Sequence, residues 1–249
     1  MKLFQRVFFA AVLAGLAAGL VMSAVQQWRV APLILAAEEY EGEAPVAAHT
    51  HEAGTPDNDH GDGHAHEHDE DAWAPQDGAE RIFYTVLANV LGSIGFAMLL
   101  AAVSVLAGIE ITAKNGVIWG LAGFVSLQLA PAFGLPPELP GMPAADLGTR
   151  QAWWVATALT TGAGLLAIAK LRNWTGIVIA AVLILAPHVW GAPAAPHEPS
   201  AVPAHLATAF AASSLFAGAV FWLIAGPLLG WFSERFAQSP AFALKGAHA

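Results

Sequence analysis

The residues with the clearest chemistry are histidines and carboxylates gathered between Glu38 and Glu80. Six histidines fall within the twenty residues from His49 to His68, acidic residues stand between them, and the chain has no cysteine. Imidazole and carboxylate together suit divalent transition ions such as cobalt, nickel, zinc and copper(II), whereas softer ions favour thiolates. The predicted metal ligands here are His49, His51, His60, His64, His66 and His68, with Glu38 and Glu41 at the membrane-proximal neck of the segment.

The spacing of these histidines favours shared ligation of one ion. His64, His66 and His68 are separated by single residues, so a flexible backbone can place two or three ring nitrogens around one metal. Gly61 and Gly63 keep that backbone pliable. We therefore predict a disordered, metal-collecting loop. The alternative is a polar linker whose histidines only keep it soluble.

Composition places this segment beside a membrane. The chain has 249 residues, of which 56% are hydrophobic and 12% charged, whereas a soluble protein carries about 25% charged residues. The net charge of −9 belongs almost wholly to the acidic segment, so nucleic-acid binding has no support. The absence of cysteine excludes disulfides and thiol catalysis.

Hydropathy predicts an all-α integral membrane protein with about six transmembrane helices, the His-rich loop lying between the first two. Each apolar run approaches the ~20 residues that cross a bilayer as a helix. The predicted spans are about Val7 to Val25, Ile82 to Gly108, Gly116 to Leu135, Arg150 to the residue before Lys170, Thr175 to Val189, and Leu206 to Trp231. These spans divide the chain into a first helix with its N-terminus (1–35), the external loop (36–81) and a five-helix bundle (82–249).

The first span carries two further expectations. A secretory signal peptide is the alternative for this segment, but its apolar core is long and no clean A-x-A cleavage site follows. Pro32 is expected to end the helix, because proline lacks the N–H that a helix interior needs. Gly15 and Gly19, four residues apart, would let another helix approach closely.

The distribution of basic residues predicts the orientation. Seven of the ten basic residues fall on the side of the two termini, and Arg29, Arg81 and Arg150 fall on the other. The positive-inside rule then makes both termini cytoplasmic, in a multi-pass protein of the cell (inner) membrane. The His-rich loop would lie outside, facing the periplasm, and would meet incoming metal.

Two predicted helices end in similar proline-containing sequences. One reads LAPAFG with Pro131, followed by PPELPG, and the other reads LAPHVWG with Pro187. Each proline lacks the N–H that would bond to the carbonyl four residues back, that of Leu127 or of Leu183. Helices broken in this way line ion sites in known transporter classes. We expect both helices to break at the same depth. The alternative is that proline and glycine simply end two helices at the interface.

Three residues near these prolines are candidate ligands. His188 is the histidine set near a helix end within the apolar region, and polar groups at such depth tend to be functional. Glu138, held between prolines, would complement it, and His205 follows in the chain. The alternatives are that His188 hydrogen-bonds a carbonyl, that Glu138 is a solvated acid, and that Arg150 is a structural clamp for Glu138 or Asp146. Trp153 and Trp154 suit an interfacial aromatic belt.

Motifs for known enzyme chemistry are missing. The sequence contains no GxxxxGK[ST] phosphate loop, no HExxH, no GxSxG and no dinucleotide fingerprint. We therefore predict that the protein is not an enzyme.

Several blocks together resemble one family. They are QRVFFAAVLAGLAAGL, IWGLAGF, LAPAFGLPPELPG, RQAWW and PHVWGAP, spread over nearly the whole chain. They are similar to the CbtA family of predicted cobalt transporter subunits. The resemblance implies cobalt uptake linked to cobalamin synthesis, together with a small single-helix, histidine-bearing partner called CbtB. It assigns no transport residues.

These observations together predict a membrane subunit for uptake of a divalent transition metal, with cobalt indicated by the resemblance. The His-rich loop would collect the ion, and the outer proline-containing helix ends would form its entry site. Two alternatives stay open. One is a nickel or zinc permease, and the other is a membrane-anchored metal-binding or sensing protein that does not transport.

Overall fold

The computed structural model describes residues 2–40, 75–196 and 199–239, and within these ranges every regular element is helical. The predicted ligands Glu41, His49, His51, His60, His64, His66 and His68 lie outside the described residues. In chain order the elements are α1 (Lys2–Arg29), α2 (Ala31–Glu38), α3 (Ala79–Ala107), α4 (Gly116–Phe124), η2 (Val125–Leu129), α5 (Ala130–Ala132), α6 (Leu147–Leu171), α7 (Trp174–Trp190) and α8 (Ala204–Gln238).

Four of these helices, α1, α3, α6 and α8, are long and apolar enough to cross a membrane. Two shorter apolar helices accompany them: α4, η2 and α5 run on as one helix over Gly116–Ala132, and α7 covers Trp174–Trp190. Each predicted span coincides with one of these helices to within a few residues, except that α8 continues to Gln238. The prediction of an all-helical membrane protein is confirmed.

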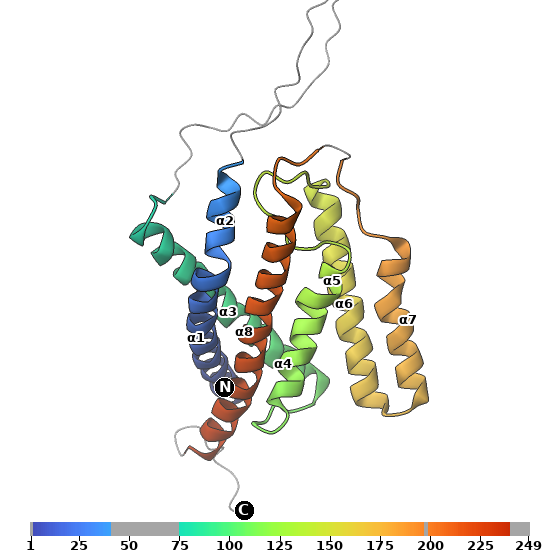
Figure 1. The fold of residues 1–249 in the computed structure, drawn as a ribbon. Helices are drawn as coiled ribbons and strands as arrows, with labels where there is room; N and C mark the ends of the chain where they lie inside the picture. The colour runs from blue at the N-terminus through green and yellow to red at the C-terminus, as the bar shows by residue number, and fades with distance from the viewer. Residues whose placement is uncertain (1, 41–74, 197–198, 240–249) are drawn as a thin grey trace, which may run out of the picture.

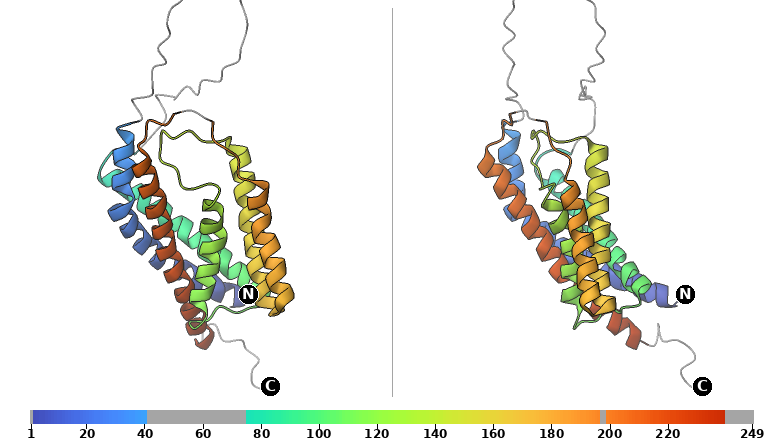
Figure 2. Two further views of the ribbon diagram at one scale, coloured as in Figure 1. Left: turned by 45° about the vertical axis from the view of Figure 1, so that its right-hand side comes forward. Right: turned by 90° about the vertical axis from the view of Figure 1, so that its right-hand side faces the viewer.

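The helices form one bundle with a thinner extension on one side (Figures 1 and 2). α1 packs against both α3 and α8, and α4 packs against the other side of α8. α6 contacts the bundle through η2 and α5, and α7 packs on α6 at the outer edge. The start of α1 and the end of α8 lie at one end of the bundle, and the residues flanking 41–74 lie at the other. We call the second end the outer end.

Glycines allow the closest helix contacts. A β-carbon built on Gly15 would lie only 2.5 Å from the Cα of Ile94, so α1 meets the backbone of α3 directly. This confirms the close approach predicted for Gly15 and Gly19. A second crossing, between α4 and α8, was not predicted: a β-carbon on Gly226 would collide with the carbonyl oxygen of Gly116. Helices in lipid gain no hydrophobic driving force when they associate, because lipid is as apolar as the helices. Small residues instead allow the close packing that stabilises such contacts.

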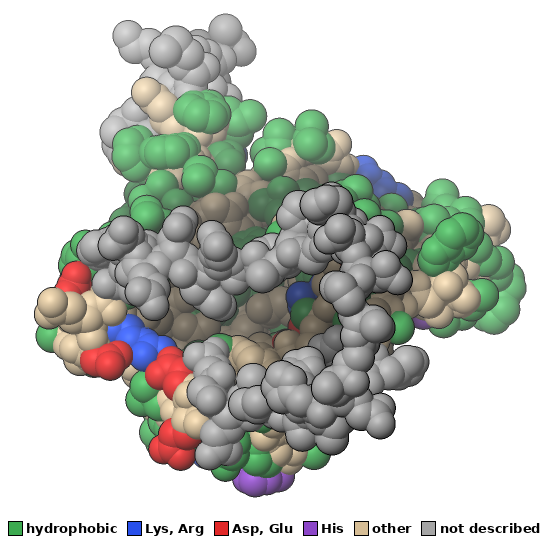
Figure 3. Space-filling model, turned by 90° about the horizontal axis from the view of Figure 1, so that it is seen from above, with side chains coloured by type: hydrophobic (Ala, Val, Ile, Leu, Met, Phe, Trp, Pro, Cys, Tyr) green, Lys and Arg blue, Asp and Glu red, His purple; other side chains and the backbone are tan. Residues whose placement is uncertain are grey.

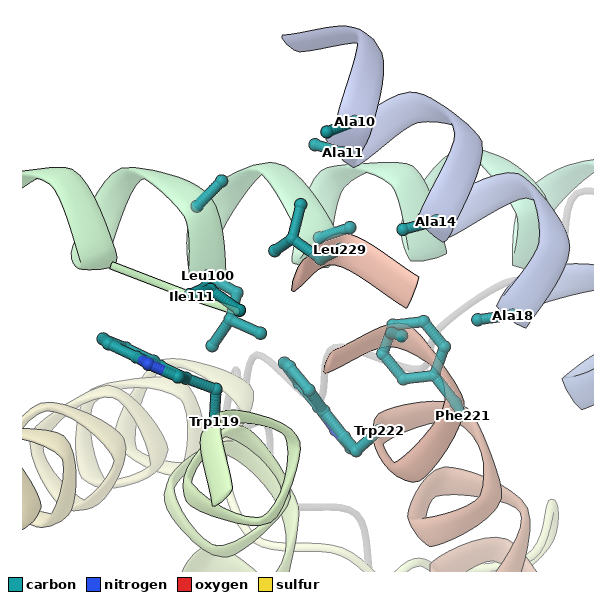
Figure 4. Close-up of a cluster of buried hydrophobic side chains, with 13 residues drawn as sticks. Ala10, Ala11, Ala14, Ala18, Leu100, Ile111, Trp119, Phe221, Trp222 and Leu229 are labelled. Atoms are coloured by element: carbon teal, nitrogen blue, oxygen red, sulfur yellow. The ribbon is translucent and has the colours of Figure 1, made fainter. Parts of the chain in front are cut away.

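The main core lies where α1, α3, α4 and α8 meet (Figure 4). Trp222 and Leu229 of α8 are fully buried, and Trp119 of α4 and Phe221 of α8 lie beside them. The facing side of α1 consists of alanines, which leave room for these rings. The extension formed by α6 and α7 contributes little to this core.

The first helix ends at Arg29, just before Pro32 as predicted, but the chain then forms a second helix, α2, that contains Pro32. Pro32 lies in the first turn of α2, where a missing N–H has no helical acceptor to lose. The N–H groups of Leu33 and Ile34 bond to the carbonyl of Val30, so the chain stays helical to Glu38. α2 therefore continues three residues into the segment predicted as loop from residue 36.

Candidate functional site

A cavity of about 650 Å³ lies at the outer end between η2, α5, α6 and α8. The segment 133–146, which follows α5, forms another part of its wall. Its polar lining residues are Gln128, Glu138, Arg150, Gln151 and Ser214. Seen from the outer end, the surface is hollowed between the helices, and basic and acidic side chains are visible inside (Figure 3). We call this space the outer cavity.

One wall of the outer cavity is a π-helical turn. Pro131 cannot donate to the helix, and over η2 the ladder widens so that the Ala130 N–H bonds the carbonyl of Val125, five residues back. The helix then continues through Pro131 to Ala132. The expected break at Pro131 is therefore a widened turn rather than an end. Such turns occur frequently at functional sites.

The expected break at Pro187 is also absent. This proline lies inside α7, which continues to Trp190 and ends at Gly191 with a φ of 94°. The carbonyl of Pro187 accepts hydrogen bonds from the Gly191 N–H and from the indole Nε1 of Trp153 at 3.1 Å. The donor that Pro187 lacks removes only the hydrogen bond to the Leu183 carbonyl, and α7 continues three residues further to Trp190. Trp153 is consequently buried, and is not part of an interfacial belt.

Gln128 presents an unused acceptor beside the outer cavity. Its Oε1 is buried and has no hydrogen-bond partner among the described residues. The Gln128 amide lies against Gly218 of α8, and a β-carbon at position 218 would leave no room for it. A buried polar atom without a hydrogen-bond partner is rare in native structures, because leaving it unpaired costs free energy. We did not single out Gln128 from sequence, although a glutamine within an apolar helix is the signal that could have found it.

Glu138 faces the same cavity and is paired with Arg150. The guanidinium donates to Glu138 Oε2 at 2.6 Å, and the two side chains are only 20% and 29% exposed. Of the interpretations offered for Arg150, the clamp on Glu138 is the one observed. Asp146 instead caps α6, because its carboxylate accepts the Thr149 N–H at 2.9 Å.

The segment carrying Glu138 is held by its neighbour Leu139. Leu139 is buried against Ala37 of α2 and Val202, which precedes α8. Prolines on both sides of Glu138 restrict the backbone further. Glu138 is therefore an anchored residue rather than a solvated loop acid.

Glu38 is also paired, at the base of the 41–74 segment. Its carboxylate accepts two hydrogen bonds from Arg81 at the start of α3, and Arg81 also pairs with Asp77 at 3.1 Å. Because Ala37 packs on Leu139, this pair lies near the segment that carries Glu138. The two predicted carboxylate ligands in the described part of the chain are thus each engaged by an arginine.

His188 contacts two backbone carbonyls. Its Nδ1 lies 2.8 Å from the carbonyl oxygen of Ile184, and its Nε2 lies 3.0 Å from that of Ala130. The ring also packs edge-on against Trp153, with centroids 5.7 Å apart. These contacts favour the hydrogen-bonding interpretation of His188, since both ring nitrogens already face acceptors. His188 does not line the outer cavity.

The described residues bring no three histidine, aspartate or glutamate side chains together in a group that could hold a metal ion. His205 is exposed in the first turn of α8. Deeper in the helices, Ser126, Thr157 and Thr161 are buried, and the hydroxyl of Thr161 has no partner within the described ranges. Any ion in the outer cavity would therefore meet mainly oxygen atoms.

A family model described as probable cobalt transporter subunit (CbtA) matches residues 4–234 of the chain. No curated protein and no solved structure matches it.

Proposed function

We propose, from the premise that this chain belongs to the CbtA family of probable cobalt transporter subunits, that it takes up a divalent transition metal through the outer cavity. The family indicates cobalt as the substrate. The predicted alternatives of nickel and zinc differ only in the ion, because oxygen and imidazole ligands do not select among these metals.

One observation carries the proposal: the side chains of Glu138 and Gln128 line one cavity at the outer end. Glu138 supplies the negative charge, and Gln128 supplies an acceptor with no partner. A divalent ion that has shed part of its water shell needs such oxygen atoms as replacements. The π turn at η2 places Gln128 beside the cavity at the depth of the apolar helices.

Arg150 gives this site a resident cation. In the structure its guanidinium neutralises Glu138, so the buried carboxylate is not left unpaired. An entering divalent ion would displace Arg150 from Glu138, and Arg150 would return after the ion leaves. We propose that this exchange lets the ion leave Glu138 again, because Arg150 then takes its place.

The remaining features complete the proposed architecture. Six helices would cross the membrane, with both termini cytoplasmic and the His-rich segment outside. That segment, with His49 to His68 and Glu41, would raise the metal concentration near the outer cavity, and the Glu38–Arg81 pair would close its base. We also propose a small single-helix, CbtB-like subunit as partner.

The experiment is cobalt accumulation in cells that lack their own cobalt uptake. The chains compared are the parent, a deletion of residues 41–74, Glu138→Gln, and Glu110→Gln as a matched exposed control at the opposite end. The chain without residues 41–74 should take up less cobalt than the parent when cobalt is scarce and nearly as much when it is plentiful, because a tethered loop only raises the local concentration. Glu138→Gln should lower uptake at every concentration, and Glu110→Gln should behave like the parent.

Immunoblots of isolated membranes must show equal amounts of each chain. If the parent accumulates no cobalt, nickel or zinc but the purified protein binds them, the metal-binding or sensing alternative replaces uptake. If deleting 41–74 abolishes uptake even at saturating cobalt while Glu138→Gln behaves like the parent, the entry site lies in the segment and not in the outer cavity.

A further inference from the structure

A second cavity, of about 980 Å³, lies between α3, α4 and α6 on the half of the bundle that holds the chain ends. It begins near Ser126 and Ala158 and ends at Asn115, Lys170 and Arg172. The twelve residue steps from Ala158 to Lys170 rise roughly 18 Å along α6, close to half of the ~30 Å hydrocarbon core. We call this space the inner cavity. It has the length of one leaflet.

The lining of the inner cavity is unsuited to an ion. Apart from Ser126, Asn115 and the two basic residues at its mouth, the side chains that line it are apolar. Two of them, Ile118 and Leu159, are 69% and 67% exposed, so the cavity opens sideways toward the lipid. α3 and α6 make little direct contact, and the cavity separates them.

The mouth of the cavity carries two cations without carboxylate partners. Neither Lys170 nor Arg172 forms an ion pair within the described part of the chain. The Nζ of Lys170 reaches toward Gly108, the C-cap of α3, where the negative end of the helix dipole favours a cation. Lys170 therefore spans the mouth from α6 to α3.

Arg172 is the second basic residue at the mouth of the inner cavity, and its backbone is unusual. It is the only non-glycine residue with a positive φ, 51°, in the described ranges, and it forms the left-handed C-cap of α6. Glycine is the usual residue at such a cap, because it adopts this conformation without strain. Arg172 nevertheless occupies this cap, and it lines the mouth of the inner cavity together with Lys170.

We infer that the inner cavity binds an anionic phospholipid. One acyl chain lies along α4 and α6 and fills the gap toward α3, and the phosphate is held by Lys170 and Arg172. Basic pockets between transmembrane helices on the cytoplasmic side suit lipid headgroups of this charge. The bound lipid would join the α6–α7 extension to the rest of the bundle, and this inference does not depend on metal uptake.

The test is native mass spectrometry of the full chain in detergent, titrated with phosphatidylglycerol or with phosphatidylcholine of the same acyl chains. The parent should retain phosphatidylglycerol in preference. Lys170→Gln with Arg172→Gly should weaken that binding about thirtyfold, since one basic residue near an anionic surface contributes about fivefold. Lys114→Gln, which neutralises an exposed cation at the same end but outside the cavity, should leave binding within about twofold.

A second variant fills the cavity without changing charge. A β-carbon on Gly162, which lines the cavity, would meet only the Oγ of Ser126 at 3.7 Å, so Gly162→Leu fits the backbone while occupying the acyl space. It should reduce phosphatidylglycerol binding at least tenfold. Equal binding of the two lipids, or full binding by both variants, would overturn the inference. So would release of a co-purified polypeptide, instead of lipid, by Gly162→Leu.

Discussion

The guanidinium of Arg150 donates a 2.6 Å hydrogen bond to Glu138 Oε2 across eleven intervening residues, and the pair forms a polar wall of the outer cavity. Both charges are mostly buried, so their attraction is screened less than that of a surface pair. The Glu138 carboxylate is thus engaged by a side chain that a metal ion must displace. The function proposed for the cavity depends on this exchange.

Arg150→Gln should tighten cobalt binding at the outer cavity by roughly tenfold, because the ion no longer competes with a tethered cation for Glu138. The same change should lower the free energy of unfolding by roughly 1–2 kcal/mol, since a partly buried carboxylate loses a charge-assisted hydrogen bond. Calorimetry on purified protein would measure the first effect. The matched control is Arg150→Gln with Glu138→Gln, in which the gain in affinity should vanish. A gain that persists would place the ion elsewhere.

A synthetic peptide covering residues 41–74 should bind several nickel or cobalt ions weakly at pH 7.5, with copper(II) held most tightly. Binding should fade below about pH 6, because imidazoles with a usual pKa near 6.5 must be deprotonated to ligate. Binding is therefore present above that pKa and is lost as the pH falls. Titration calorimetry that gave no heat with either ion at pH 7.5 would remove the collecting role.

His188→Ala should lower cobalt uptake at every concentration, because it removes the link between α7 and the Ala130 carbonyl of α5. His188→Gln should restore at least half of the uptake, since its amide can still donate to a carbonyl. This pair of variants separates the two interpretations of the residue. A glutamine variant as inactive as the alanine variant, at equal expression, would favour metal ligation by the imidazole.

Gly226→Ala should destabilise the bundle by roughly 1–3 kcal/mol, because the added β-carbon overpacks the crossing of α8 with α4. Gly95→Ala is the matched control on α3, where a β-carbon would meet nothing within 4 Å, and it should leave the melting temperature unchanged or slightly higher. Thermal unfolding in detergent would compare them. Equal melting temperatures would show that α4 and α8 do not approach this closely.

A reporter fused after Ala249 should lie in the cytoplasm, and one inserted within residues 41–74 should lie outside. The reason is the seven-to-three distribution of basic residues between the two ends. Paired reporters that are active on opposite sides of the membrane would measure this. An external C-terminus would make the His-rich segment a cytosolic store of metal and would place the inner cavity in the outer leaflet.

The positions of the helices followed from the sequence because hydropathy is a local property. Each long apolar run must become a helix in lipid, since no water is present to satisfy its backbone groups. Three further features were predictable for the same reason, because each depends on runs and spacings along one chain. They are the family resemblance, the close approach at Gly15 and the shared side of the two chain ends. The short helix α2 that contains Pro32 was not predicted, because a proline disrupts the middle of a helix but is tolerated in the first turn of a new one.

Only the tertiary structure decided which polar groups meet. Arg81 pairs with Glu38 across 43 positions of sequence, and Leu139 anchors Glu138 by packing on Ala37. The unpartnered Gln128 oxygen exists because Gly218 of α8 leaves room for the amide but offers no donor. Local sequence cannot specify these contacts, because they depend on which faces of distant helices are pressed together. The position of each helix follows from the summed hydropathy of its own residues, whereas the contacts of a buried side chain are set by packing in three dimensions.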